Sequence, residues 1–188
     1  MNSLFFKAII VAIIGVGLLS PQLGEAGKGG SKTVNMSYAG TGFDTTFYND
    51  GYGPSTALPV SLSQGNGKGS LGKFAFTTTT EFALPTGVGQ CASDTDELEF
   101  PLISSEEVTT FADQSQLFSV ASGGYSCVSL SKGYYYGQVE ADYIGGTGRF
   151  EGATGTYTSP FEGQNFGDPN VGFRSITGTV EGTVNRSK

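Results

Sequence analysis

The chain contains no histidine, although 17 acidic residues, nine tyrosines and two cysteines offer other chemistry. Serine and cysteine nucleophiles usually take their general base from a histidine, so neither a Ser-His-Asp nor a Cys-His system can be assembled. Two cysteines alone also cannot complete a tetrahedral zinc site. Any catalysis must therefore use carboxylates, tyrosine hydroxyls, backbone groups or ordered water, and we expect no metal and no cofactor.

The densest group of charges consists of Asp94, Asp96, Glu97 and Glu99. Clustered carboxylate oxygens can hold calcium, particularly outside the cell. This cluster lacks the central glycine and the terminal glutamate spacing of a calcium-binding loop. A solvated acidic loop is the simpler interpretation.

Two further carboxylates, Glu140 and Asp142, alternate with Val139, Ala141 and Tyr143. Successive side chains of a β-strand point to opposite faces, so the carboxylates share one face and the apolar residues share the other. We expect the apolar face to line the protein interior, which leaves the carboxylates in solvent. Such a pair lacks the cleft and fixed separation that glycoside hydrolysis requires.

Tyrosines are concentrated at residues 134–136, with Tyr143 and Tyr157 nearby along the chain. Tyrosines that face inward can line a pocket for a flat apolar ligand. The candidate lining residues are Tyr134, Tyr136, Tyr143 and Tyr157. Packing of the same rings in an ordinary core is the alternative interpretation.

Nucleotide and nucleic-acid binding are both disfavoured. Residues 67–73 match the Gly-x-x-x-x-Gly-Lys part of a phosphate-binding loop, but Phe74 follows where a magnesium-binding hydroxyl is required. The net charge of −7 also opposes binding to nucleic acids and anionic membrane surfaces, which call for basic patches.

The beginning of the chain has the pattern of a signal peptide. Lys7 precedes twelve residues, 8–19, that are uncharged and apolar apart from glycine, and small residues flank Glu25 at Gly24 and Ala26. A membrane span needs about 20 apolar residues, so this segment is too short to serve as an anchor. We expect residues 1–26 to be removed and the protein to be secreted or periplasmic, with no membrane anchor after cleavage.

Cys91 and Cys127 are 36 positions apart. In an exported chain, two cysteines are expected to form a disulfide. Closing a loop of this length would stabilise the fold by roughly 4 kcal/mol in the chain-entropy model. Two free, buried thiols are the alternative.

The remaining chain predicts an all-β protein. After a flexible leader at 27–32, residues 33–188 show short alternating segments broken by Gly, Asn, Asp and Ser, which is typical of a single barrel or sandwich domain. The segments give eight to ten strands, and a small even number of strands can close into an antiparallel barrel without exposed edges; we expect about eight. Pro101 indicates an edge or a bulge. The predicted strands are 33–39, 58–62, 74–82, 98–102, 108–111, 116–121, 125–130, 134–144, 155–163 and 173–184.

Residues 145–152 read Gly-Gly-Thr-Gly-Arg-Phe-Glu-Gly, and a further glycine follows three positions later. This run resembles the strand–turn–strand signature of allene oxide cyclases, and dirigent proteins carry a similar Gly-Gly-Thr-Gly-Lys-Phe element in the same barrel fold. The glycines permit a sharp turn at the end of a barrel, and the phenylalanine can plug the core. The residues expected in this structural role are Gly145, Gly146, Gly148, Phe150, Gly152 and Gly155.

The resemblance implies a barrel, and its families often form dimers or trimers, which implies a homo-oligomer. Allene oxide cyclases hold an apolar epoxide in a preformed cavity. The polar groups that they use lie outside the matching run, so the resemblance does not assign the activity. Three functions stay open: an exported barrel that binds a small apolar ligand or a partner, a cyclase or isomerase of such a molecule, and a structural protein with a filled barrel.

Overall fold

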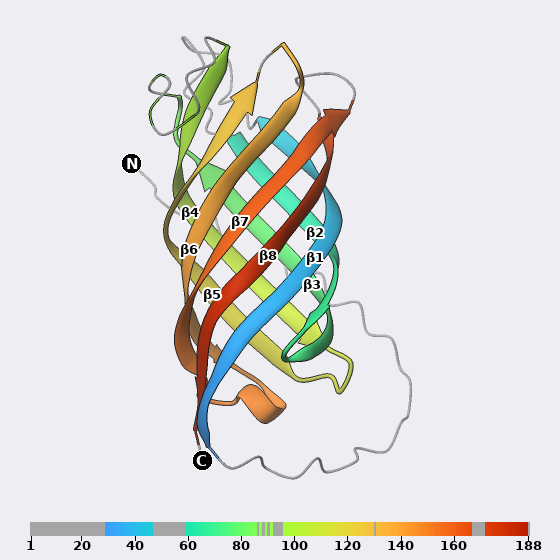
Figure 1. Ribbon diagram of the computed structural model, residues 1–188, viewed down its shortest axis with the longest axis vertical. Coiled ribbons are helices and arrows are strands. Elements are labelled where there is room, and N and C mark those ends of the chain that lie inside the picture. Colours follow the sequence, from blue (N-terminus) through green and yellow to red (C-terminus); the bar gives the residue numbers. More distant parts are fainter. Residues whose placement is uncertain are drawn as a thin grey trace, which may run out of the picture.

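The protein is a closed barrel of eight antiparallel strands (Figure 1). The computed structural model describes residues 29–46, 59–85, 87, 89, 91, 96–129, 131–166 and 172–187, so the predicted signal peptide lies outside the described residues. No helix in these ranges is long and apolar enough to cross a membrane. The elements are β1 (Gly30–Thr46), β2 (Pro59–Gly69), β3 (Gly72–Phe82), β4 (Glu97–Phe111), β5 (Gln116–Ser129), β6 (Tyr134–Gly146), the single 3-10 turn η1 (Gly148–Phe150), β7 (Thr154–Phe166) and β8 (Phe173–Arg186).

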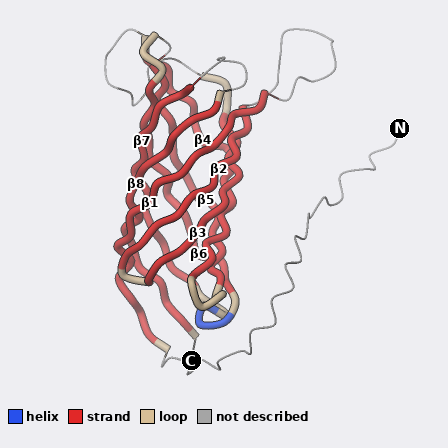
Figure 2. Tube along the Cα trace, turned by 90° about the vertical axis from the view of Figure 1, so that its right-hand side faces the viewer, coloured by secondary structure: helices blue, strands red, loops and turns tan. Residues whose placement is uncertain are grey.

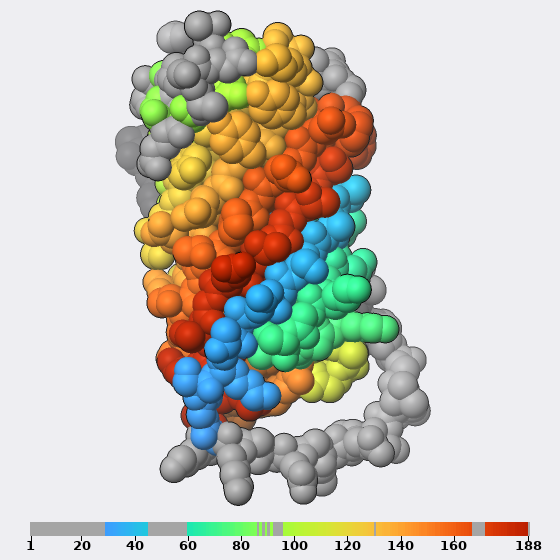
Figure 3. Space-filling model, in the orientation of Figure 1, coloured from blue at the N-terminus to red at the C-terminus, as the bar shows by residue number. Residues whose placement is uncertain are grey.

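Each strand pairs with the next one along the chain, and β8 closes the barrel on β1. This confirms the predicted all-β barrel of about eight strands. In the space-filling view the diagonal strands β7, β8, β1 and β2 form one continuous outer surface (Figure 3). Closure leaves every strand with two partners, so no sheet edge is open.

The strands are fewer and longer than the sequence pattern predicts. The segments 98–102 and 108–111 are parts of β4, and 116–121 and 125–129 are parts of β5. The glycines that predicted a turn in β5 are absorbed as an irregularity, because the pairing with β6 shifts between Ala121 and Gly123. Glycine within a strand can mark a bulge as well as a turn.

Two predicted loops are also strand. Residues 64–69, predicted as a turn, extend β2 until Gly69 pairs with Gly72, so the connection to β3 is very short. Residues 30–32, predicted as part of a flexible leader, belong to β1, because the end of β8 offers them a partner: Gly30 lies opposite Arg186. Both segments have a composition typical of flexible loops, but hydrogen bonding to a neighbouring strand holds them in the sheet.

The irregularity predicted near Pro101 occurs in β4. Opposite β3, Ser104 pairs with Glu81 but Leu102 pairs with Phe82, so Ile103 is the extra residue of a bulge. A one-residue shift exchanges the two faces of a strand. As a consequence, Glu97 lies on the same face as the outward Tyr136, whereas Glu107, beyond the bulge, points into the barrel.

The glycine-rich run after β6 lies at the lower end of the barrel and contains η1 (Figure 2). Gly148 adopts a φ of +58°, a left-handed conformation that favours glycine. Phe150 is only 1 % exposed, and its ring centroid lies 4.8 Å from that of Phe111. Arg149 stacks over both rings and forms an ion pair with Asp113 at 3.3 Å. Phe150 is therefore a buried part of the core at this end of the barrel.

Candidate functional site

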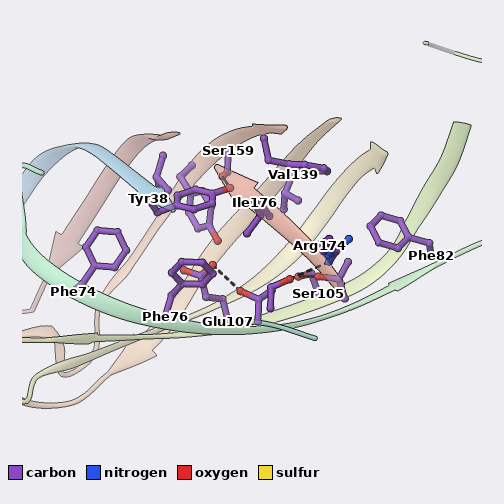
Figure 4. A pocket seen from close by; sticks show the side chains of 16 residues that line it. Tyr38, Phe74, Phe76, Phe82, Ser105, Glu107, Val139, Ser159, Arg174 and Ile176 are labelled. Atoms are coloured by element: carbon purple, nitrogen blue, oxygen red, sulfur yellow. Dashed lines mark hydrogen bonds between the residues drawn. The ribbon is translucent and has the colours of Figure 1, made fainter. Parts of the chain in front are cut away.

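Inside the barrel, between Phe150 and the opposite end, lies a cavity of about 60 Å³. Its wall combines aromatic rings, hydroxyl groups and a few aliphatic side chains with one carboxyl group, Glu107, and one guanidinium group, Arg174. Arg174 and Phe82 lie toward one end and Phe74 toward the other, with Glu107 between them (Figure 4). The aromatic lining residues are Tyr38, Phe74, Phe76, Phe82, Tyr157 and Phe161.

Glu107 projects from β4 below the bulge and is held by two hydroxyl groups. Thr78 donates to Oε2 at 3.1 Å, and Thr109 donates to Oε1 at 2.7 Å. Among the described residues no basic side chain forms an ion pair with it. Burial raises the pKa of Glu107 above its ordinary value, and the two hydroxyl hydrogen bonds oppose this shift. The site therefore combines a desolvated carboxyl group with hydrogen-bond donors that favour its ionised form.

Tyrosine hydroxyls supply the other polar groups of the interior. The Tyr38 hydroxyl is 3.1 Å from that of Ser159, and the Tyr157 hydroxyl is 2.9 Å from that of Ser119. Burial raises the pKa of Tyr38 to about 12, and the nearby charge of Glu107 adds to the rise. Burial also raises the pKa of Tyr157. Both tyrosines are consequently neutral across the physiological pH range and can donate hydrogen bonds.

Arg174 carries the positive charge at the Phe82 end of the cavity. Its Nη1 lies 3.3 Å from Oδ1 of Asp44, its Nη2 donates to Ser63 at 3.0 Å, and its guanidinium lies 5.2 Å from the Tyr135 ring centroid. The Ser61 hydroxyl donates to the same carboxylate of Asp44. The charge of Arg174 is therefore compensated by Asp44, while that of Glu107 has no such counterpart in the described part of the chain.

The structure separates the four tyrosines that were predicted to line a pocket. Tyr157 lines the cavity, and Tyr143 is buried against it with ring centroids 4.9 Å apart. Tyr134 and Tyr136 do not line it: both hydroxyls donate to Glu97 on the outer side of the barrel. Their placement is a correction to the prediction, and strand alternation is the reason, because the intervening Tyr135 is the inward residue.

The carboxylates of the acidic cluster at the start of β4 have separate hydrogen-bond partners. Asp96 accepts hydrogen bonds from Ser129 and Ser131, which lower its pKa to about 2. Glu97 accepts from the two outward tyrosines. Asp94 lies outside the described residues. Within the described ranges no three acidic or sulfur ligands come together as a metal site.

The second carboxylate pair lies as the alternation predicted. Glu140 is exposed and Asp142 is partly exposed, whereas Ala141 and Tyr143 between and beyond them are buried. Neither carboxylate lines the interior cavity. Their exposure leaves them without the desolvation that Glu107 experiences.

Cys91 and Cys127 form the predicted disulfide, with Cα atoms 5.5 Å apart. Cys127 is fully buried on β5, so the bond ties the segment that precedes β4 to the barrel wall. The backbone amide of Glu99 donates to the carbonyl of Gly87 at 2.8 Å and anchors the same segment. The disulfide and this hydrogen bond thus fix the described residues Cys91 and Gly87 against β5 and β4.

Glu107 and Arg174 were not predicted as site residues from the sequence. Glu107 lies on the same face of its strand as Thr109 and the buried Phe111. Arg174 lies on the same face as Ile176 and the buried Val180. This two-residue spacing from buried apolar side chains is the sequence signal that could have predicted both charged side chains inside the barrel. An inward charge among apolar residues is itself a reason to examine a position.

No family model matches this chain, and no curated protein is similar to it in sequence. The eight-stranded barrel is a general architecture and does not by itself identify a family. The functional interpretation therefore depends on the cavity.

Proposed function

We propose that the protein is an exported barrel that binds a small, largely apolar molecule, or one end of it, with a polar group directed at Glu107. The observation that carries this proposal is the position of Glu107, the one carboxyl group on the described wall of a cavity otherwise dominated by aromatic and hydroxyl side chains. Pockets of this composition, mostly apolar with a few converging polar groups, commonly bind small molecules.

The size of the cavity limits the ligand. A single water molecule needs about 10–15 Å³ of such space, and pockets for drug-sized ligands measure roughly 300–1,000 Å³. The cavity of about 60 Å³ therefore suits a very small molecule or the head of a longer one. The alternative of a structural protein with a completely filled barrel is disfavoured, because the interior contains this open space and a carboxyl group on its wall.

A second candidate is a cyclase or isomerase that acts on an apolar molecule, in a barrel of the allene oxide cyclase or dirigent type. The raised pKa of Glu107 favours this candidate, because a carboxyl group that holds its proton to higher pH can act as a general acid. The similarity to this family is supported by the glycine-rich run, which forms a tight turn at Gly148 and buries Phe150 at the end of the barrel. Binding is common to both candidates, so it is tested first.

Export remains part of the proposal. The bonded Cys91–Cys127 pair is consistent with an oxidising compartment, where disulfides persist. Mass measurement of the protein recovered from the medium or periplasm should give a chain that begins at Gly27. Recovery from the cytoplasm with residues 1–26 intact would contradict this part.

Native mass spectrometry of protein purified from the cells that naturally make it tests the binding function. We expect an added small-molecule mass that is lost on denaturation and that is reduced in Glu107→Gln. Glu106→Gln is the matched control, because it removes the same charge from the adjacent, outward position on β4. A ligand-free wild-type protein that also gains no thermal stability from any member of a small-molecule library would contradict the proposal. Turnover of the recovered ligand would then distinguish an enzyme from a binding protein.

A further inference from the structure

The charged side chains that line the cavity indicate which charge the bound part of a ligand would carry. We infer that the cavity binds a small organic cation, an alkylated ammonium group, between the Glu107 carboxylate and the aromatic wall. This inference rests on the proposed binding function and narrows it to one ligand class. It has three supports, which are the charge of the wall, its rings and its size.

The first support is the uneven treatment of the two interior charges. Arg174 has its own carboxylate in Asp44 at 3.3 Å, whereas Glu107 receives only the neutral hydroxyls of Thr78 and Thr109. An ionised carboxylate removed from water is costly unless a positive charge compensates it. A monocation in the cavity would provide that charge without disturbing the Arg174–Asp44 pair.

The groups that face Glu107 from the other strands are neutral. Thr78 of β3 and Ser119 of β5 lie opposite Glu107 on the two strands that pair with β4. Tyr38 of β1, Tyr143 of β6 and Tyr157 of β7 are close enough for the charge of Glu107 to raise their pKa values, and burial keeps their hydroxyls protonated. Arg174 on β8 is the cationic group on the described wall, and Asp44 compensates it.

The second support is the aromatic character of the wall. Tyr38 and Phe76 meet edge to face with centroids 5.1 Å apart, and Tyr157 lines the same cavity. The face of an aromatic ring attracts a cation, and the attraction is stronger where water is excluded. Rings of this kind around a carboxylate favour an ammonium group over a neutral group of the same shape.

The third support is size. A cavity of about 60 Å³ has room for about four to six water molecules at about 10–15 Å³ each. A trimethylammonium head, with four non-hydrogen atoms, is of this order, whereas an extended apolar chain is not. The rest of a longer ligand would have to lie outside the cavity.

A pair of isosteric probes tests the inference. Choline and 3,3-dimethylbutan-1-ol have the same shape and differ in one positive charge. Titration calorimetry at pH 8 should show at least tenfold tighter binding of choline to the wild-type protein and to Glu106→Gln. Glu107→Gln should lose this preference and bind both probes about equally. Choline binding should also release protons when the pH is low enough for the free carboxyl group to be partly protonated, because the cation lowers its pKa.

The outcomes separate the inference from the proposed function. If the alcohol binds the wild-type protein as tightly as choline, the cation inference is wrong while the binding function stands. If neither probe binds, and no library member does, both fail. The comparison of probes on the wild-type protein does not depend on the folding of any variant. An unchanged preference for choline in Glu107→Gln would also overturn the assignment to Glu107.

Discussion

Thr78 and Glu107 lie directly opposite each other on β3 and β4, and the threonine hydroxyl donates to the carboxylate at 3.1 Å. Both side chains point into the barrel, where burial works against the charge of Glu107. This pair therefore determines in part how readily the carboxyl group ionises.

Replacing Thr78 by valine should raise the pKa of Glu107 further, because valine keeps the shape of threonine but removes a donor to the ionised form. NMR titration of the Glu107 side-chain carboxyl carbon measures the shift. Thr79→Val is the control, since Thr79 is exposed on the outer face of the same strand. Equal titration curves for the two variants would show that the Thr78 hydrogen bond does not influence the carboxyl group.

Glu107 should make the stability of the protein fall as the pH rises. Its pKa is higher in the folded protein than the ordinary 4.5 expected in the unfolded chain, so the folded state binds more protons in the interval between the two values. The contribution is complete below pH 4.5 and is lost as the pH rises through the folded pKa. Urea unfolding of wild type, Glu107→Gln and Glu106→Gln between pH 4 and pH 9 measures this. Parallel curves for wild type and Glu107→Gln would contradict the prediction.

Phe150→Ala should destabilise the barrel by about 3–5 kcal/mol, the usual cost of removing a buried phenylalanine ring. The ring is 1 % exposed and packs on Phe111, and Arg149 stacks over both rings. Phe166→Ala is the control, because that ring is 53 % exposed and its loss should change the free energy of unfolding by less than about 0.5 kcal/mol. Similar losses in both variants would show that the Phe150 ring is not an essential part of the core.

Loss of the Cys91–Cys127 bond should reduce stability by roughly 4 kcal/mol for a separation of 36 residues. The double substitution to serine avoids reactive thiols, and its urea midpoint can be compared with that of the oxidised protein. Reduction of the wild-type protein should add the mass of two hydrogens. Thiol alkylation without reductant should give no adduct, and an adduct under these conditions would mean that the cysteines are not bonded.

The architecture was largely predictable from the local sequence pattern. The alternation of apolar and polar residues and the glycines between strands can both be read from residues that are close together in the chain. The inward placement of Ala141 and Tyr143 followed in this way. The exact strands did not, because glycines at residues 123 and 124 can end a strand or form a bulge within one, and only the pairing with β6 decides between these outcomes.

The candidate site was harder to predict for a related reason. Alternation indicates which residues share a face, but it does not say which face is inside when polar and aromatic residues occur on both. Tyr134 and Tyr136 share a face that points outward, and Tyr135 occupies the inward one. In β4 the bulge at Ile103 reverses the faces, so the phase of Glu97 gives no information about that of Glu107. The inward position of the Glu107 carboxyl group therefore follows only from the pairing of the strands in the folded barrel.

The pairing of Gly30 with Arg186 places the start of the first strand beside the end of the last one, at the rim that holds Phe150. The Ser187 hydroxyl donates to the carbonyl of Glu151 at 2.6 Å and secures this junction. A short linker could therefore join the two ends, with new termini opened between other strands, as proteins with adjacent ends commonly tolerate. A surface or a fused domain attached at this rim would leave the Arg174 end of the barrel pointing away from the attachment point.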